Sequence, residues 1–224
     1  MSCPIPGELN GDPALVDGKC GKALSFDGVD DWALVPSVLS GLSGTAVTIE
    51  LWMKVTKPWA NSIPHMVTGG NENNYRLSLT GGGFDGGRVN WRVTFNNDMK
   101  IVSVHYEPTT FPSNEWVHLA GTYDGTSQRV YVDGKLAVES KVQSGPIFYP
   151  PKGRFALGAY TDDNEHYPFE GRIEQVTLWD RALDPKEITR LFDERKKLFP
   201  AIETVASSAT SEDWPTFLHD NEQS

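Results

Sequence analysis

The sequence lacks the features that define several large protein classes. Only two cysteines, Cys3 and Cys20, occur among its 224 residues, which excludes a four-thiolate zinc site, and they do not form C-x-x-C. No apolar run is long enough to span a bilayer. Residues 1–4 have neither the basic nor the apolar region of a signal peptide, so either the protein stays inside the cell or the sequence omits that signal.

The two cysteines leave two alternatives open. If Cys3 and Cys20 pair, the disulfide closes a short N-terminal loop and stabilises the fold by about 3 kcal/mol. If they do not pair, they are two free thiols, one of them in a frayed terminus. We favour the disulfide.

Basic residues are scarce relative to acidic ones. The chain has 20 Lys and Arg against 30 Asp and Glu, a net charge of −10. An acidic surface repels phosphate backbones, so we expect no nucleic-acid partner. The same charge suits calcium binding, although a solvated acidic face is the commoner explanation of such a charge.

Helical periodicity is almost absent, which excludes a βαβ architecture. One helix is expected at 184–197, with Asp184 as its cap and Pro185 in its first position. Residues 1–19 are interpreted as an irregular lead-in. From Lys22 onward the apolar residues recur every second position, as in residues 47–55, which predicts strands with one buried face.

About a dozen such strands are separated by turn signals, among them Asp124-Gly125 and Asp133-Gly134. Many short strands with glycine-rich turns pack most naturally as two layers. The sequence therefore predicts an all-β, two-sheet antiparallel sandwich with one short C-terminal helix.

Five segments, in order, resemble one family. Residues 18–28 resemble the opening "GKxGKALxFDG" of LamG-like jelly-roll domains in the concanavalin A-like lectin/glucanase superfamily. Similar matches to the family's strand motifs occur at 47–54, 116–125, 130–134 and 169–183. The resemblance implies a jelly roll at 1–199, of a kind often appended to secreted or periplasmic proteins and often binding carbohydrate or calcium. Fold alone does not fix the ligand.

The tail differs from the rest of the chain. Residues 200–212 are small and polar and are interpreted as a linker. Residues 213–221 resemble the opening of the first blade of quinoprotein-like β-propellers. Residues 200–224 are therefore either a linker with the start of a truncated following domain, or a disordered tail.

Polar residues at alternate positions of neighbouring predicted strands form a candidate carbohydrate-binding platform, with loops at its rim. Sugars are held by hydrogen bonds from polar side chains and by packing against aromatic rings. The candidate binding residues are Asn71, Asn73, Arg76, Asn90, Arg92, His105, Asp162, Asp163, His166 and Tyr167. An ordinary solvated face explains each of them singly.

A structural calcium ion is a second candidate, because calcium takes six to eight oxygen ligands. The metal-binding candidates are Asp27, Asp30, Asp31 and Glu174. No EF-hand spacing is present. The sequence also departs from the family here, because Glu174-Gln175 stands where the family has Asp-Glu.

Catalytic signatures are missing. Glycosidases of this superfamily place carboxylates at i, i+2 and i+4 of one strand, whereas Arg172 interrupts Glu170 and Glu174. A lyase site built from His105, Tyr106 and His118 is conceivable.

We expect instead a non-catalytic carbohydrate-binding module of a larger extracellular or periplasmic protein, whose partner is a glycan or a neighbouring domain. The alternatives are a structural or protein-interaction module and, less favoured, a polysaccharide-degrading enzyme.

Overall fold

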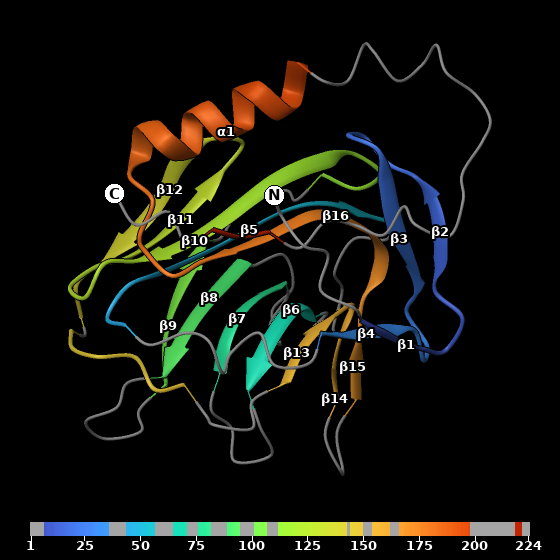
Figure 1. Cartoon of the computed structure of the whole chain (residues 1–224), viewed down its shortest axis with the longest axis horizontal. Coiled ribbons are helices and arrows are strands. Elements are labelled where there is room, and N and C mark those ends of the chain that lie inside the picture. The colour runs from blue at the N-terminus through green and yellow to red at the C-terminus, as the bar shows by residue number, and fades with distance from the viewer. Residues whose placement is uncertain are drawn as a thin grey trace.

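Two sheets face each other across one apolar core in the computed structural model (Figure 1). The structure describes residues 7–35, 44–56, 65–70, 76–81, 89–94, 101–106, 112–142, 144–149, 154–161, 166–197 and 218–220. Within them the fold is the predicted all-β sandwich with a single helix, so this prediction is confirmed. Among these residues, no helix has the length and apolar character needed to cross a bilayer.

In each sheet, the spatial order of the strands differs from their order along the chain. From edge to edge, the seven-stranded sheet consists of β1 (Glu8–Asn10), β4 (Trp32–Val35), β13 (Arg154–Leu157), β6 (His65–Gly70), β7 (Arg76–Gly81), β8 (Val89–Thr94) and β9 (Ile101–Tyr106). The eight-stranded sheet consists of β12 (Lys135–Ser140), β11 (Gln128–Val132), β10 (Trp116–Tyr123), β5 (Val47–Val55), β16 (Glu170–Trp179), β3 (Lys22–Asp27) and β2 (Ala14–Asp17), with β17 (Leu218–Asp220) added in parallel to β16. A separate hairpin pairs β14 (Ala159–Thr161) with β15 (His166–Pro168).

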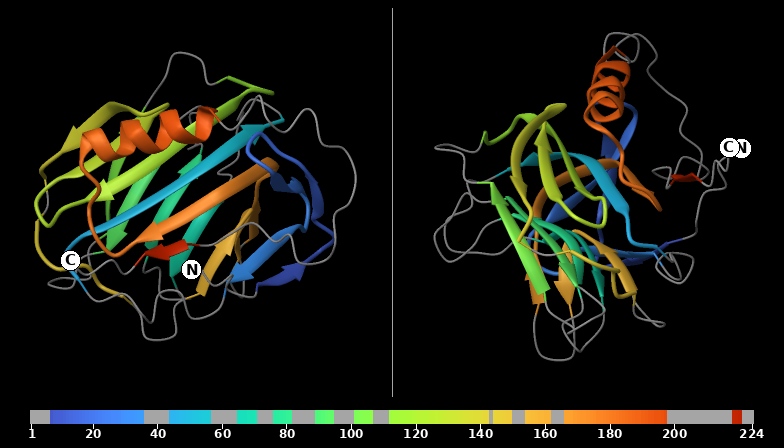
Figure 2. Two further views of the ribbon diagram at one scale, coloured as in Figure 1. Left: turned by 45° about the horizontal axis from the view of Figure 1, so that its top comes forward. Right: turned by 90° about the vertical axis from the view of Figure 1, so that its left-hand side faces the viewer.

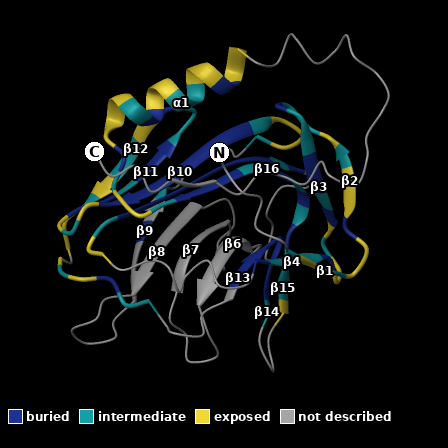
Figure 3. Ribbon diagram, in the orientation of Figure 1, coloured by how far each residue is buried: buried dark blue, intermediate teal, exposed yellow. Residues whose placement is uncertain are grey.

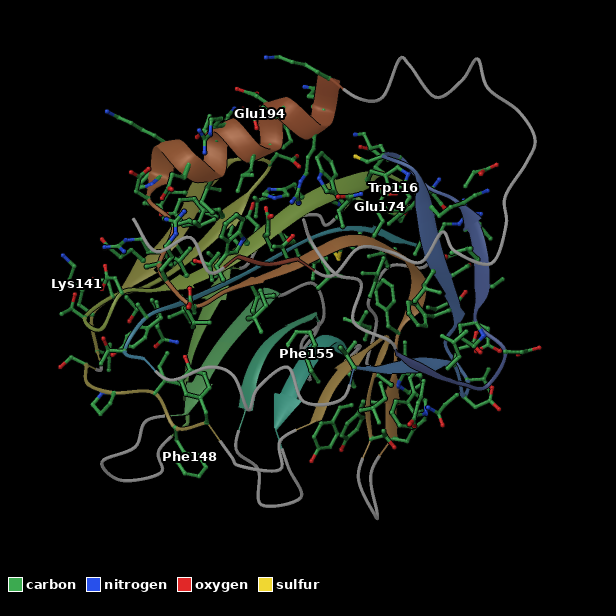
Figure 4. All side chains as sticks on the ribbon, viewed as in Figure 1. Trp116, Lys141, Phe148, Phe155, Glu174 and Glu194 are labelled. Carbon is green, nitrogen blue, oxygen red and sulfur yellow. The ribbon has the colours of Figure 1, made fainter. Side chains whose placement is uncertain are left out.

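The core lies between the sheets because alternate residues of each strand point toward it. Ile49, Leu51 and Met53 of β5 have no exposed surface. In the opposite sheet, Phe155 of β13 is 1% exposed and lies between the two layers (Figure 4). The predicted period of two thus builds one continuous core.

The outer face of β5 is also buried, which corrects the prediction of a single buried face. Glu50 and Trp52 are 0% and 1% exposed, although they alternate with the core residues Ile49, Leu51 and Met53. Nearly all of β5 is accordingly coloured as buried (Figure 3). Helix α1 (Pro185–Lys197) lies across this side of the eight-stranded sheet (Figure 2). A second layer of packing therefore covers the middle of that sheet.

Helix α1 begins where the sequence predicted it. The Asp184 carboxylate accepts hydrogen bonds from the backbone N–H groups of Lys186 and Glu187, at 2.7 and 2.8 Å. In return Glu187 accepts one from the Asp184 N–H at 2.8 Å. This reciprocal capping box satisfies the first free amides of the helix. Ile188, on the apolar stripe, is fully buried against the sheet.

The lead-in at 1–19 was interpreted wrongly in part, because it contains β1 and β2. These short strands are largely exposed and show no clear alternation, so periodicity could not reveal them. Their pairing is tertiary: β1 adds to β4, and β2 adds to β3. They extend one edge of each sheet.

A bulge in β16 sets the faces of its central residues. The register with β5 shifts between Glu174 and Thr177, and Gln175 has a φ of 52°. The extra residue at this point shifts the alternation by one position, which decides the face of the sheet on which each following residue lies. Val176 therefore joins the core, while Thr177 lies on the helix-covered side, bonded to Arg195 at 3.2 Å.

Candidate functional site

The outward face of the seven-stranded sheet can be assigned from strand register. Leu157, Val67, Leu79, Trp91 and Val104 follow one another across β13, β6, β7, β8 and β9. The two end members, Leu157 and Val104, belong to the core. This row therefore lies on the inner face, and the residues one position away lie on the outer face.

Three rows of mainly polar residues cross that outer face. In the middle row Arg92 is paired with Ser78 on one side and Ser103 on the other. In a second row Asn90 is paired with Thr80 and His105. We call this surface the polar face, defined by Thr68, Gly70, Arg76, Ser78, Thr80, Asn90, Arg92, Thr94, Ile101, Ser103, His105, Arg154 and Ala156.

Four of the predicted binding residues meet on the polar face. They are Arg76, Asn90, Arg92 and His105. Asn71, Asn73, Asp162 and Asp163 lie outside the described residues. That these residues bind carbohydrate stays a prediction.

His166 and Tyr167 lie on the β14–β15 hairpin. The Tyr167 ring stacks on that of buried Tyr160, with centroids 5.9 Å apart. His166 is exposed, and its Nε2 is 3.0 Å from the carbonyl oxygen of Val29, to which it can donate a hydrogen bond. The hairpin is thereby joined to the loop that follows β3, where the acidic residues gather.

The structure brings together only part of the predicted metal cluster. Carboxylate oxygens of Asp30, Asp31 and Asp12 lie within 4.8 Å of one another. Asp12 was not predicted, because it comes from the lead-in and no motif marks it. Both oxygens of buried Asp31 already accept backbone N–H bonds, from Asp12 at 2.8 Å and Asp27 at 2.9 Å.

Local hydrogen bonds therefore account for much of this cluster. Asp27 accepts the N–H of Val29 at 2.8 Å, an ordinary turn contact. Three carboxylates are fewer than the six to eight oxygens that calcium takes. Calcium binding stays a prediction, and its donors here would be Asp12, Asp30 and Asp31.

Glu174 lies apart from this cluster. Its carboxylate accepts the backbone N–H groups of Lys19 and Cys20, at 2.8 and 2.9 Å, and is fully buried on the eight-stranded sheet (Figure 4). A Cβ at Gly18 would collide with it. Burial raises the pKa of Glu174, although the two amides oppose that shift. Its role here is to hold the 18–20 segment against β16.

Cys20 is a free, buried thiol, so the predicted disulfide with Cys3 is wrong for this structure. Its Sγ lies 3.7 Å from the carbonyl oxygen of Arg195. Burial raises the pKa of the Cys20 thiol to about 12. Because the thiolate is the reactive form, burial disfavours reaction of this cysteine in the folded protein.

A buried ionic cluster joins helix α1 to the eight-stranded sheet. Glu50 on β5 forms an ion pair with Arg195, with Oε1 2.7 Å from Nη2, and its Oε2 lies 3.1 Å from His118 Nε2. Burial opposes ionisation of Glu50, but the hydrogen bond with His118 and the charge of Arg195 outweigh it and hold the Glu50 pKa below its usual value. Phe192 stacks on Trp52, with centroids 5.5 Å apart. No part of Glu50 or His118 is exposed, so this cluster is structural.

The described residues do not have the arrangement that the enzymatic alternatives require. His118 is buried beneath α1 on the eight-stranded sheet, whereas His105 and Tyr106 lie on β9 of the other sheet. Glu174 is fully engaged with backbone amides, so it cannot pair with Glu170 across a cleft. Neither of the two catalytic arrangements considered as alternatives is assembled by the described residues.

Comparison with known families agrees with the fold. A family model described as the concanavalin A-like lectin/glucanases superfamily matches residues 27–189, more than half of the chain. The chain belongs to the concanavalin A-like lectin/glucanases superfamily. The strands that build the lectin/glucanase sandwich, from β4 to β16, lie inside the matched region.

Two relatives are much longer than the segment that they share with this lectin/glucanase-type chain. Pappalysin-1 of Mus musculus is 32% identical over 89 residues, covering 40% of this chain and 5% of that protein. Pappalysin-1 of Homo sapiens is 34% identical over 74 residues, covering 33% and 4%. The chain thus matches only a small part of the length of these relatives.

Two solved structures share the fold at low identity. Domain 4 of AbnA, a GH43 extracellular arabinanase from Geobacillus stearothermophilus in complex with arabinotriose, has a TM-score of 0.66 and 24% identity, covering 83% of this chain and 87% of that one. The binding domain of Paraclostridial Mosquitocidal Protein 1 has a TM-score of 0.67 and 18% identity, covering 85% and 47%. At these identities the likeness shows a shared fold alone.

Proposed function

We propose that the chain is a non-catalytic carbohydrate-binding module of an extracellular protein, and that its ligand lies on the polar face. The observation that carries the proposal is the register, which gathers Arg76, Asn90, Arg92 and His105 on one side of one sheet. Hydroxyl, amide and guanidinium groups at strand spacing are the donors and acceptors that sugar hydroxyls require.

The two sheets differ in what covers their outer sides, and this difference supports the polar face as the ligand site. The outer side of the eight-stranded sheet is covered by α1 and filled by the Glu50 cluster. The one helix among the described residues therefore leaves the outer side of the seven-stranded sheet without such a cover (Figure 2). The polar face of the seven-stranded sheet is therefore the surface on which we place the ligand.

The comparisons add independent support. One structural neighbour is a domain of an extracellular arabinanase and carries arabinotriose in its crystal. A domain of similar extent with that fold can bind an oligosaccharide. By analogy, we also propose that this chain lies outside the cytoplasm and acts beside other domains.

The test is a binding screen against a broad glycan array, with and without calcium. We expect retention of one glycan class, and loss of that signal in the Arg92→Ala variant. Arg190→Ala is the matched control, because Arg190 is exposed on α1, with only a 3.9 Å contact to Glu194. Silence across the array would leave a structural or protein-interaction module. Release of reducing sugars would instead indicate an enzyme.

A further inference from the structure

Helix α1 covers the outer side of the eight-stranded sheet only in part. Along β5 it reaches Glu50 through Arg195, at 2.7 Å, and Trp52 through the stacked ring of Phe192. The next outward residue of β5 is Lys54, two positions beyond Trp52, which is roughly 7 Å along the strand. Lys54 is half-buried, whereas Glu50 and Trp52 are buried. The cover over β5 therefore becomes thinner toward this end of the sheet.

The register places four half-buried side chains in one row at this end of the sheet. Lys54 is paired with Trp116 of β10 on one side and with Arg172 of β16 on the other, and Arg172 is paired in turn with Ser25 of β3. All four alternate with core residues, so they lie on the outer side. Cross-strand neighbours have Cβ atoms about 4.5–5.5 Å apart. We call these residues the Trp116 row, after the tryptophan labelled in Figure 4.

The two cations of the Trp116 row have few partners in the protein. Arg172 makes one long contact, from Nη1 to the carbonyl oxygen of Asp17 at 3.4 Å, although a guanidinium carries five N–H donors. Among the described residues, no carboxylate forms an ion pair with Lys54 or Arg172. Lys19 adds a third cation nearby, with its Nζ 4.6 Å from the centre of the Trp52 ring. The donors of the row are therefore available to a ligand.

The carboxylates on either side of Arg172 along β16 are already engaged. Glu174 is fully buried, and its two oxygens accept the backbone N–H groups of Lys19 and Cys20. Glu170 is half-buried and has interactions of its own. In a chain with a net charge of −10, two adjacent cations without an acidic partner are a local exception.

An indole ring beside two cations matches two features of an acidic sugar. The CH face of a sugar packs on an aromatic ring. Its carboxylate or sulfate accepts charge-assisted hydrogen bonds from ammonium and guanidinium groups. Trp116 and Arg172 stand two strand spacings apart, roughly 10 Å, with Lys54 between them. The Ser25 hydroxyl at the end of the row suits a sugar hydroxyl.

We propose that the Trp116 row binds an acidic sugar residue, whose ring packs on Trp116 and whose anionic group is held by Lys54 and Arg172. This inference rests on the proposed carbohydrate-binding function, and it adds a second contact surface on the other sheet together with the class of its ligand. The anionic group is a carboxylate or a sulfate, two sources of one chemistry.

An acidic peptide matches the row less well than an acidic sugar. Peptides dock by adding a strand to a sheet edge or by laying apolar side chains into a groove. The Trp116 row lies on β10, β5, β16 and β3, which are all interior strands of their sheet. Beside Trp116 the row offers only polar side chains. Peptide binding is therefore an outcome that the experiment has to separate.

The experiment compares small ligands that differ in charge. Binding to the full chain would be measured by titration calorimetry with trigalacturonate, with its methyl ester, with a heparin tetrasaccharide, with neutral arabinotriose and with hexaglutamate. We expect at least tenfold tighter binding of trigalacturonate or the heparin tetrasaccharide than of the ester and arabinotriose. Added salt should reduce this preference, because the cations are partly exposed. Which of the two anionic saccharides binds identifies the carboxylate or the sulfate as the recognised group.

Substitutions in the row test its three binding side chains. Lys54→Gln and Arg172→Gln each remove one positive charge and should each weaken binding of the acidic saccharide about tenfold. Trp116→Ala should weaken it by roughly three- to tenfold, whereas Trp116→Phe should keep most of the affinity because a ring remains. Thermal unfolding would confirm that each variant is folded.

Two control variants place the ligand on one sheet or the other. Arg190→Ala on exposed α1 and Arg92→Ala on the polar face should both leave binding of the acidic saccharide unchanged. If Arg92→Ala abolishes that binding while Arg172→Gln keeps it, the acidic saccharide lies on the polar face and the Trp116 row is not its site.

The remaining outcomes separate this inference from the function on which it rests. Equal or tighter binding of arabinotriose or of the methyl ester would overturn the acidic ligand and leave carbohydrate binding intact. Tighter binding of hexaglutamate than of any saccharide would make the row a peptide site and contradict the inference. If neither anionic saccharide binds, the inference alone is wrong, because the glycan array tests the wider function independently.

Discussion

Glu50 shows how one buried residue ties three distant parts of the chain together. Its carboxylate meets His118 from β10 and Arg195 from the end of α1, and none of its surface is exposed. A buried ion pair adds little stability when compared with an apolar replacement, but removing one partner leaves a charge unpaired in a poorly solvated place. The cost of losing Glu50 is therefore mostly the stranded charge of Arg195.

Replacing Glu50 with glutamine should lower the free energy of unfolding by about 3 kcal/mol at pH 7. Urea unfolding followed by fluorescence measures it. Glu194→Gln is the control, because Glu194 is exposed and lies 3.9 Å from Arg190, so its loss should cost less than about 0.5 kcal/mol. The pair Glu50→Gln with Arg195→Met should recover part of the loss; if it does not, the stranded charge is not the cause.

The same substitution has a defined pH dependence. The folded-state pKa of Glu50 lies below its usual value. Its contribution to stability is therefore complete above the unfolded pKa of about 4.3 and is lost as the pH falls through the folded pKa. The difference between the native chain and the glutamine variant should shrink as the pH falls below about 4. An equal difference at pH 7 and pH 3 would contradict this account.

At the residue scale, the sequence predicted on which face of a strand a residue lies, but not which distant residues it contacts. Alternation placed Glu50 on the side of β5 away from the core. Nothing in the sequence linked it to Arg195, because that contact depends on how α1 lies across the sheet. For the same reason Glu174 was grouped with Asp27 and Asp30, although its carboxylate binds the 18–20 segment.

At the scale of elements, α1 depends on a local cap as well as on burial. The Asp184 carboxylate bonds two backbone amides, and Glu187 returns a bond to Asp184. Replacing Asp184 with alanine should lower the free energy of unfolding by about 1 kcal/mol. Urea unfolding measures this loss. Asp193→Ala, at an exposed position in the helix interior, is the control and should change little; an equal loss in both variants would argue against capping.

Elements with strong local patterns were predictable, and edge elements were not. β5, β10 and α1 carry clear periods and caps, and the turn at Asp133-Gly134 has positive φ at both residues, as the sequence predicted. β1 and β2 have only three and four residues and are largely exposed. Such strands exist because an established edge offers free backbone groups, which no local pattern encodes.

At the scale of the whole molecule, the sandwich has two unlike outer surfaces. One sheet is covered by α1 and sealed by ion pairs, aromatic stacking and the 18–20 segment. The other presents a polar, acid-free face on its central strands. The first surface contributes to stability, while the second is where we propose that the ligand lies.

The boundary predicted at residue 199 follows from this arrangement and can be tested by truncation. A chain ending at Phe199 keeps every strand of both sheets except β17, and it keeps α1. β17 pairs with β16 over only three residues, Thr177 to Trp179. Each backbone hydrogen bond contributes about 0.5–1.5 kcal/mol, so the truncated chain should lose no more than about 2 kcal/mol of unfolding free energy.

The control is a chain ending at Leu183, which also removes α1. That chain would expose Trp52 and leave Glu50 without Arg195, so it should unfold at far lower urea or fail to fold. Loss of β17 also frees an edge of β16, and free edges pair with other chains. Sedimentation of the Phe199 chain should therefore show more self-association than the full chain at high concentration. If the Phe199 chain were as unstable as the Leu183 chain, residues 200–224 would be part of the folding unit, and the predicted boundary would be wrong.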